Sequence, residues 1–154
     1  PARNNCTEPM LLPTFWEMLE NHADYDGKRI APFYRIGGIM PVIHTHVSVS
    51  TTPEQREALK TAYGKAITAV PGKSEGWLMC PFEDNMPIYF GGDDSKPAAY
   101  VEVNVFGRSV PGSAWEKLTE QIMAALNKEL GIPADRTYIR YTATTDWGWN
   151  GGNF

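Results

Sequence analysis

The sequence is short of cysteine, with only Cys6 and Cys80 in the whole chain. They stand far apart, with neither a CxxC pair nor the cysteine and histidine spacing of a zinc motif. No disulfide framework or metal motif is encoded, which favours a reducing cytoplasm. The chain also lacks a run of about 18 apolar residues and a basic segment followed by an apolar one. We therefore expect no membrane-spanning helix and no secretion signal.

Positive charge is scarce as well. Lys and Arg together number 14 against 18 Asp and Glu, a net charge of -4, and the basic residues are scattered along the chain. Phosphate backbones are bound by clustered Lys and Arg, so a nucleic-acid partner is not expected. With 154 residues of which 42% are hydrophobic, the chain can bury one core, as a single domain with an appendage.

Two parts of the chain differ in character. Residues 1–39 show poor periodicity, with a short helix expected over residues 14–21 and a polar turn over residues 24–29. We interpret them as an N-terminal extension of unknown role and residues 40–154 as the folded domain.

The domain begins with a strand predicted over residues 42–49. A helix follows, for which Thr52 is the expected N-cap, Pro53 the first residue and Gln55 the partner in a capping box. Pro71 and Gly72 end its apolar pattern. The apolar run over residues 77–82 then predicts a short buried strand.

A second copy of this pattern follows the first. Residues 98–106 alternate as a strand with one covered face, and Ser113 with Glu116 predicts another capping box. Gly131 ends that helix, and residues 137–142 form the closing strand. The sequence therefore predicts a duplicated β-α-β unit of the α+β class. Two helices cover one face of its sheet, so a partner subunit is expected to cover the other.

Six short blocks, in order along residues 40–154, resemble the macrophage migration inhibitory factor family of the tautomerase superfamily, and most of all its bacterial phenylpyruvate tautomerases. The blocks are Met40-Pro41-Val42-Ile43, Gly72-Lys73, Phe90-Gly91-Gly92, Phe106-Gly107, Asp135-Arg136-Thr137-Tyr138-Ile139 and Gly148-Trp149-Asn150-Gly151-Gly152-Asn153-Phe154. The resemblance implies a tautomerase fold, with a four-stranded mixed sheet and two helices, in a homotrimer.

The resemblance also implies a cofactor-free mechanism in which an N-terminal proline, here Pro41 after loss of Met40, is the general base. A free α-amine titrates at about 8, so its pKa must fall for it to accept a proton near neutral pH. Burial and a nearby cation both lower it. Lys73 matches the family's active-site lysine, which supplies that cation and binds a substrate carboxylate.

The pocket walls of the family correspond to aromatic residues, some of them contributed by a neighbouring subunit. Arg140 replaces the asparagine of the mammalian relatives and is a second candidate for binding carboxylate, because it shares a strand face with Tyr138. Ala98 and Val101 replace the mammalian CxxC, so thiol oxidoreductase activity is not expected. The aromatic residues are Phe106, Tyr138, Trp147, Trp149 and Phe154.

Each of these residues also has a structural interpretation. Lys73 fits a solvated lysine at a helix end, and Arg140 fits an ion pair inside the trimer. The C-terminal aromatics fit subunit packing. His44 and His46 share a strand face and are able to chelate a metal, but the sequence shows no third ligand, so no metal site is expected.

The function that these residues favour is keto–enol tautomerisation of 2-oxo acids such as phenylpyruvate. A dehalogenase or decarboxylase that uses the same proline fits the same residues. The alternative from another class is an interaction protein of the cytokine type.

Residues 1–39 conflict with a catalytic Pro41, because an internal proline nitrogen is an amide without useful basicity. Three interpretations stay open: a removable pro-segment, a real extension that fills the pocket, and a start assigned too early. Ile36-Gly37-Gly38-Ile39-Met40 can be encoded with AGGAGG, a bacterial ribosome-binding sequence, ahead of the Met40 codon, which suits the last of these.

Overall fold

The computed structural model describes residues 40–153. The helix expected over residues 14–21 and the whole N-terminal extension lie outside the described residues, as does Phe154. The division of the chain at residue 40 therefore stays a prediction.

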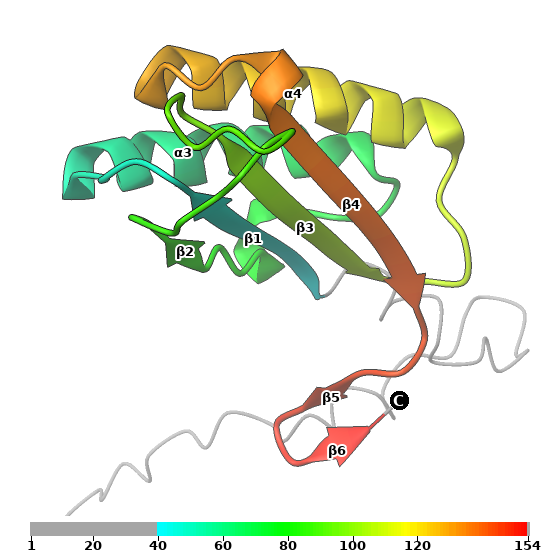
Figure 1. Ribbon diagram of the computed structural model, residues 1–154. Coiled ribbons are helices and arrows are strands. Elements are labelled where there is room, and N and C mark those ends of the chain that lie inside the picture. The colour runs from blue at the N-terminus through cyan, green and yellow to red at the C-terminus, as the bar shows by residue number, and fades with distance from the viewer. Residues whose placement is uncertain (1–39, 154) are drawn as a thin grey trace, which may run out of the picture. The chain divides into compact units, whose positions relative to one another are not determined.

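A four-stranded sheet with two helices on one face forms the described domain (Figure 1). Its strand order is β2-β1-β3-β4, with β1 parallel to β2, β3 parallel to β4, and β1 antiparallel to β3. Each parallel pair is joined through one helix, which confirms the duplicated β-α-β unit and the mixed sheet. The main elements are β1 (Pro41–Val47), α3 (Pro53–Ala66), β2 (Phe82–Glu83), β3 (Ala99–Phe106), α4 (Gly112–Leu130) and β4 (Thr137–Thr144).

Helix α3 begins as the sequence predicts. The Thr52 side chain accepts from the Gln55 backbone N–H, and the Gln55 side chain accepts from the Thr52 backbone N–H, which completes the capping box. The helix continues into a 3-10 turn, η1 (Ile67–Ala69), and Gly72, with φ of 76°, redirects the chain. The capping residues and the glycine thus fix both limits of this segment.

The predicted start of the second helix is wrong in detail. Helix α4 begins at Gly112 with Pro111 as its N-cap, and no side chain caps it, so Ser113 and Glu116 form no capping box. Ser113 lies inside the first turn, where its hydroxyl is no longer ahead of the free N–H groups that a cap must meet. The C-terminal end is confirmed, since Gly131 adopts the left-handed conformation with φ of 67°.

The buried strand predicted over residues 77–82 is also wrong. The segment starts in a 3-10 turn, η2 (Glu75–Trp77), and only Phe82 and Glu83 form strand β2. Met79 is 63% exposed. Its backbone still bonds to β1, from Met79 N to the Pro41 oxygen at 3.0 Å and from Ile43 N to the Met79 oxygen at 2.9 Å. Pro81 has no N–H to donate, so a regular ladder does not extend through it.

The core lies between the sheet and the two helices. Alternate residues of β1 and β3 point into it, among them Ile43, Val47, Val101 and Val103, all essentially inaccessible to solvent. The intervening residues face the other side of the sheet, because side chains alternate along a strand. Register pairs the rows across three strands: His44 with Glu102 and Arg140, and His46 with Tyr100 and Tyr138. We call this second side the open face.

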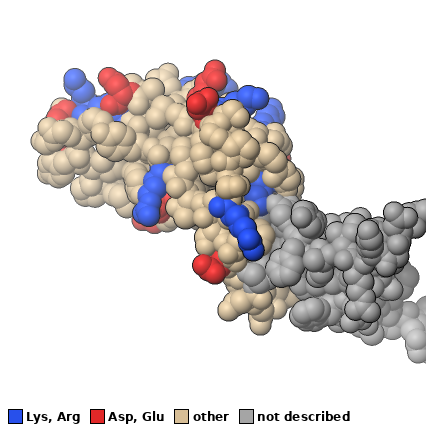
Figure 2. Space-filling model, turned by 90° about the vertical axis from the view of Figure 1, so that its right-hand side faces the viewer, with Lys and Arg blue, Asp and Glu red and all other residues tan. Residues whose placement is uncertain are grey.

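Positive and negative side chains are interspersed on the side of the molecule in Figure 2, with no broad area of one sign. Over residues 40–153, neither helix has the length and apolar character needed to cross a membrane.

Candidate active site

The start of β1 carries the predicted catalytic proline. Pro41 is buried and pairs with Val105 of β3. Met40 just before it is also buried and has a φ of 67°, which a residue with a side chain rarely adopts. A non-glycine residue in this region costs about 1–3 kcal/mol, so the Met40–Pro41 junction holds backbone strain.

Lys73 lies in the turn after the first helix, immediately beyond Gly72. Its backbone N–H donates to the Val70 oxygen at 3.1 Å, which fixes the turn. The side chain is only 7% exposed, so the interpretation of Lys73 as a solvated lysine is wrong. Burial lowers the pKa of its ammonium group below the ordinary value for lysine.

Phe106 links Lys73 to the strand start. The Lys73 ammonium donates to the Phe106 carbonyl oxygen at 2.7 Å and lies 5.7 Å from the centre of the Phe106 ring. The Phe106 backbone N–H in turn donates to the Met40 oxygen at 3.3 Å. One residue of β3 therefore places a buried cation beside the residue that precedes Pro41.

A cavity of about 220 Å³ opens next to this cation. Pro41 is not among the residues that line it. The lining combines a buried ammonium group with apolar walls, a combination suited to a small acid with an apolar body. It is formed by Val70, Pro71, Lys73, Phe106, Gly107, Ser109, Val110 and Pro111.

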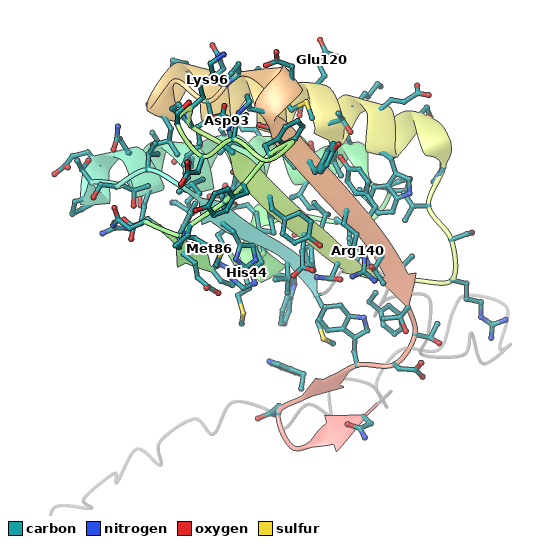
Figure 3. All side chains as sticks on the ribbon, viewed as in Figure 1. His44, Met86, Asp93, Lys96, Glu120 and Arg140 are labelled. Carbon is teal, nitrogen blue, oxygen red and sulfur yellow. The ribbon has the colours of Figure 1, made fainter. Side chains whose placement is uncertain are left out.

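Tyr138 and Arg140 lie elsewhere, on the open face of β4, where both side chains are exposed as predicted for one shared face. The Tyr138 ring packs 5.0 Å from the Phe90 ring, and Arg140 Nη1 lies 4.0 Å from Glu102 Oε1. Figure 3 shows Arg140 projecting from β4.

After β4 the chain forms a short hairpin of β5 (Gly148–Trp149) and β6 (Gly152–Asn153), with Trp147 just before it and Trp149 in its first strand. Trp147 donates from Nε1 to the Thr144 oxygen at 3.1 Å, so it packs back on the strand end. The ring of Trp149 meets Trp77 edge-on at 5.5 Å. Sequence reasoning missed Trp77 because it assigned this residue to a buried strand. Its ring instead lies, 46% exposed, in the segment just after Lys73.

Two other blocks of the resemblance have a structural role. The Arg136 guanidinium is nearly buried and donates to the carbonyl oxygens of Phe90, Asp93, Lys96 and Pro97. It also pairs with the Asp93 carboxylate at 3.3 Å. Arg136 thus holds the loop that contains Gly91 and Gly92, both at positive φ.

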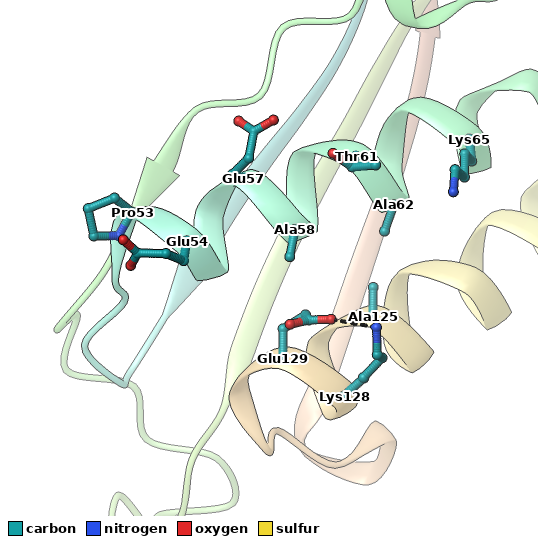
Figure 4. Close-up of a pocket in the computed structure, with 10 residues that line it drawn as sticks. All are labelled: Pro53, Glu54, Glu57, Ala58, Thr61, Ala62, Lys65, Ala125, Lys128 and Glu129. Atoms are coloured by element: carbon teal, nitrogen blue, oxygen red, sulfur yellow. Dashed lines mark ion pairs between the residues drawn. The ribbon is translucent and has the colours of Figure 1, made fainter.

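A wider hollow of about 730 Å³ lies between the two helices, on the side away from the sheet (Figure 4). Small side chains, including Ala58, Ala62 and Ala125, form its floor. Its charged residues carry both signs, and Lys128 pairs with Glu129 at 2.9 Å. The hollow therefore offers no cluster of cations for an acidic ligand.

Cys80 is the only cysteine within the described residues, and it is not in a disulfide. Burial raises the pKa of its thiol to about 11. The thiol is therefore protonated at neutral pH and is a poor nucleophile.

Comparison with known proteins gives matches over the same part of the chain. The family model described as macrophage migration inhibitory factor (MIF) matches residues 40–154. The structure of MIF2 from Leishmania major is 43% identical, covers 77% of this chain and 100% of its own, and has a TM-score of 0.70. A homologue from Prochlorococcus marinus is 30% identical over 73% of this chain and 98% of its own, with a TM-score of 0.63. A macrophage migration inhibitory factor homolog from Trichinella spiralis is 28% identical over 119 residues, which are 75% of this chain and 100% of that protein.

Proposed function

The chain belongs to the macrophage migration inhibitory factor family of the tautomerase superfamily, and from this premise we propose that it is a cofactor-free keto–enol tautomerase of 2-oxo acids such as phenylpyruvate. The observation that carries the proposal is the buried Lys73 ammonium, held by Phe106 beside the start of β1. Burial of an ammonium group costs free energy that hydrogen bonds and an opposite charge offset, and the carboxylate of an acid substrate would supply that opposite charge.

In the proposed mechanism, the secondary amine of a processed Pro41 takes a proton from the carbon next to the substrate carbonyl. The C–H bond breaks, its electron pair forms the C=C bond of the enolate, and negative charge moves to the oxygen. Protonated Pro41 then returns the proton to that oxygen, which forms the enol. The Lys73 ammonium binds the carboxylate and disfavours the protonated amine, so it keeps the proline neutral.

This mechanism requires a free amine at Pro41. In the 154-residue chain the nitrogen of Pro41 is an amide whose lone pair is delocalised into the Met40 carbonyl. The strain at Met40 supports a form in which this residue has been removed, because its removal releases that strain. We therefore propose that the active protein begins at Pro41.

The test compares two forms of the protein on phenylpyruvate, followed by ultraviolet absorbance. One is the full chain, verified as uncleaved by intact mass, and the other begins at Pro41. We expect turnover only from the second. A Pro41→Ala variant of the shorter form, which keeps a free amine, controls for the amine alone. Equal turnover from the uncleaved full chain would show that Pro41 is not the base, and no turnover from either form would favour an interaction protein.

A second part of the proposal is a homotrimer in which the open faces are covered. Tyr138 is 66% exposed, and the side chain of Arg140 is 69% exposed, although both lie on a sheet. We propose that they reach the Lys73 site of a neighbouring subunit, where Arg140 becomes a second carboxylate ligand. Trp147, Trp149 and Phe154 complete the proposed pocket wall.

Light scattering coupled to size exclusion tests this assembly, with a trimer as the expected mass. A stable monomer with full activity would contradict the shared site. A sharper test mixes Lys73→Met chains with Arg140→Ala chains and assays them at a low phenylpyruvate concentration, where the raised KM of each variant leaves little turnover. Mixed trimers are expected to recover activity only if the two residues act from different subunits.

A further inference from the structure

Two histidines and a glutamate meet on the open face, at the β2 edge of the sheet and away from the start of β1. His44 and His46 stand two residues apart on β1, so both side chains point to that face. Glu83 is the register partner of His46 on the neighbouring strand β2. Figure 3 shows His44 at this edge of the sheet. The third ligand that the sequence does not reveal is thus supplied by strand pairing.

We propose that His44, His46 and Glu83 form a binding site for a divalent transition-metal ion, with zinc as the expected ion. One ligand atom from each residue lies within 4.8 Å of the other two. His44 Nε2 is 2.8 Å from Glu83 Oε1, and His46 Nδ1 is 3.8 Å from Glu83 Oε2. Tetrahedral zinc with bonds of about 2.1 Å holds its ligand atoms about 3.4 Å apart. Small side-chain rotations therefore suffice to admit the ion.

The state of His46 points independently to a ligand. Its side chain is only 12% exposed, and among the residues that the structure describes neither of its ring nitrogens has a hydrogen-bond partner. Buried ring nitrogens nearly always have partners. A metal at Nδ1 would satisfy one of them, and the Glu102 carboxylate, 3.9 Å from Nε2, is placed to satisfy the other.

Glu102 is itself held in position for this role. The Tyr100 hydroxyl donates to its Oε1 at 2.9 Å. A carboxylate behind a metal-bound histidine orients the ring and increases its basicity as a ligand. Glu102 is thus a positioning residue for the site.

The ligand set selects the class of ion. Two imidazoles and one carboxylate suit zinc and its neighbours in the first transition row, whereas calcium and magnesium prefer oxygen ligands throughout. Three protein ligands leave a fourth position for water or an anion. Since β2 has only two residues, an ion that joins Glu83 to β1 would also fasten this edge strand.

The experiment uses the full untagged chain, stripped of metal with a chelator and transferred to chelator-free buffer. Titration with zinc chloride in a calorimeter is expected to give one ion per chain, and zinc is expected to raise the Tm. His44→Gln and His46→Gln are expected to abolish the binding, and Glu83→Gln to weaken it at least about tenfold. His22→Gln, which changes the third histidine of the sequence, is the matched control and should bind as the native chain does.

Cobalt(II) keeps the test decisive if a histidine variant fails to fold. The native chain with cobalt is expected to show visible ligand-field bands without the near-ultraviolet charge-transfer band of a thiolate ligand. A thiolate band would show that the ion is bound by Cys6 or Cys80, and this result would overturn the proposal. So would the absence of zinc binding to the native chain, or unchanged binding in folded His44→Gln and His46→Gln variants.

Discussion

The two β-α-β copies differ in character at the residue that follows the glycine beyond each helix, Gly72 in the first copy and Gly131 in the second. The two helix N-caps, Thr52 and Pro111, are separated by the same number of residues as the two glycines, Gly72 and Gly131. The copies therefore align without a gap over this region. In this alignment Lys73 corresponds to Ile132, and both are buried. An apolar side chain costs nothing at this position, whereas a buried ammonium must be compensated. The fold by itself needs only an apolar residue at this position, so the lysine of the first copy indicates a further role.

Aligned buried residues of the two helices also differ in polarity between the copies. Leu59 corresponds to Leu118, and both are fully buried against the sheet, as the fold requires of either copy. Tyr63 corresponds to Ile122 and is also fully buried, but it carries a hydroxyl that accepts from Thr45 at 3.2 Å. At these two aligned positions the first copy therefore carries a buried polar group and the second an apolar side chain.

Substitutions that exchange charged and apolar character at Lys73 and Ile132 give the largest expected change in the free energy of unfolding. Ile132→Lys puts a charge at a fully buried position of the hydrophobic core, and it should reduce the free energy of unfolding by about 3 kcal/mol or more. Lys73→Met should change it by less than about 1 kcal/mol, because burial already disfavours the ammonium. Urea denaturation measures both. If Ile132→Lys is as stable as the native protein, both copies tolerate a buried lysine at this position, and Lys73 is then not evidence for a special role.

The second prediction concerns activity and applies to the form that begins at Pro41. Lys73→Met should raise KM for phenylpyruvate by at least about tenfold, as expected for loss of a charge-assisted hydrogen bond. It should also move the acidic limb of the kcat/KM profile to higher pH, because removing a nearby cation raises the pKa of the proline amine. Lys60→Met, on the outer surface of α3, is the control. An unchanged KM and pH profile would leave Lys73 with a structural role only.

The third prediction uses Tyr63 and depends on pH. Tyr63→Phe should cost about 1 kcal/mol near pH 7, because Thr45 loses its buried partner. Burial raises the pKa of Tyr63 well above its ordinary value of 10.0. Its folded form therefore keeps the proton longer than the unfolded chain, and the related stability is present below pH 10 and lost as the pH rises above it. The difference between variant and native protein should shrink at about pH 11 in urea titrations. A constant difference would mean that Tyr63 is not the group that titrates.

The smallest effects concern the helix starts. Thr52→Ala removes a working cap and should cost about 1 kcal/mol. Ser113→Ala, near the start of the aligned helix, should change stability by less than about 0.5 kcal/mol, because Ser113 caps nothing. Thermal denaturation of the two variants side by side measures the contrast. Equal losses would indicate that Ser113 caps α4 in solution.

Much of the fold could be predicted from local signals. Thr52, Gln55 and Gly131 set helix limits, because capping and left-handed turns involve residues close in sequence. Alternation over residues 98–106 identified β3 correctly. The same approach failed for residues 77–82, because a short apolar run does not reveal whether its backbone joins a ladder or packs as a turn. It failed at Ser113 because two plausible starts lay within two residues of each other.

The sequence by itself determined the duplicated unit, the family resemblance and the candidates Pro41 and Lys73, since these depend on residue type and order. The tertiary structure alone decided that Lys73 is buried on Phe106, that Trp77 meets Trp149, and that Glu83 stands beside His44 and His46. These partners are far apart along the chain. Their meeting depends on strand register and on the path of the connecting loops, which are set by packing of the whole sheet against its helices and are not encoded in any local periodicity.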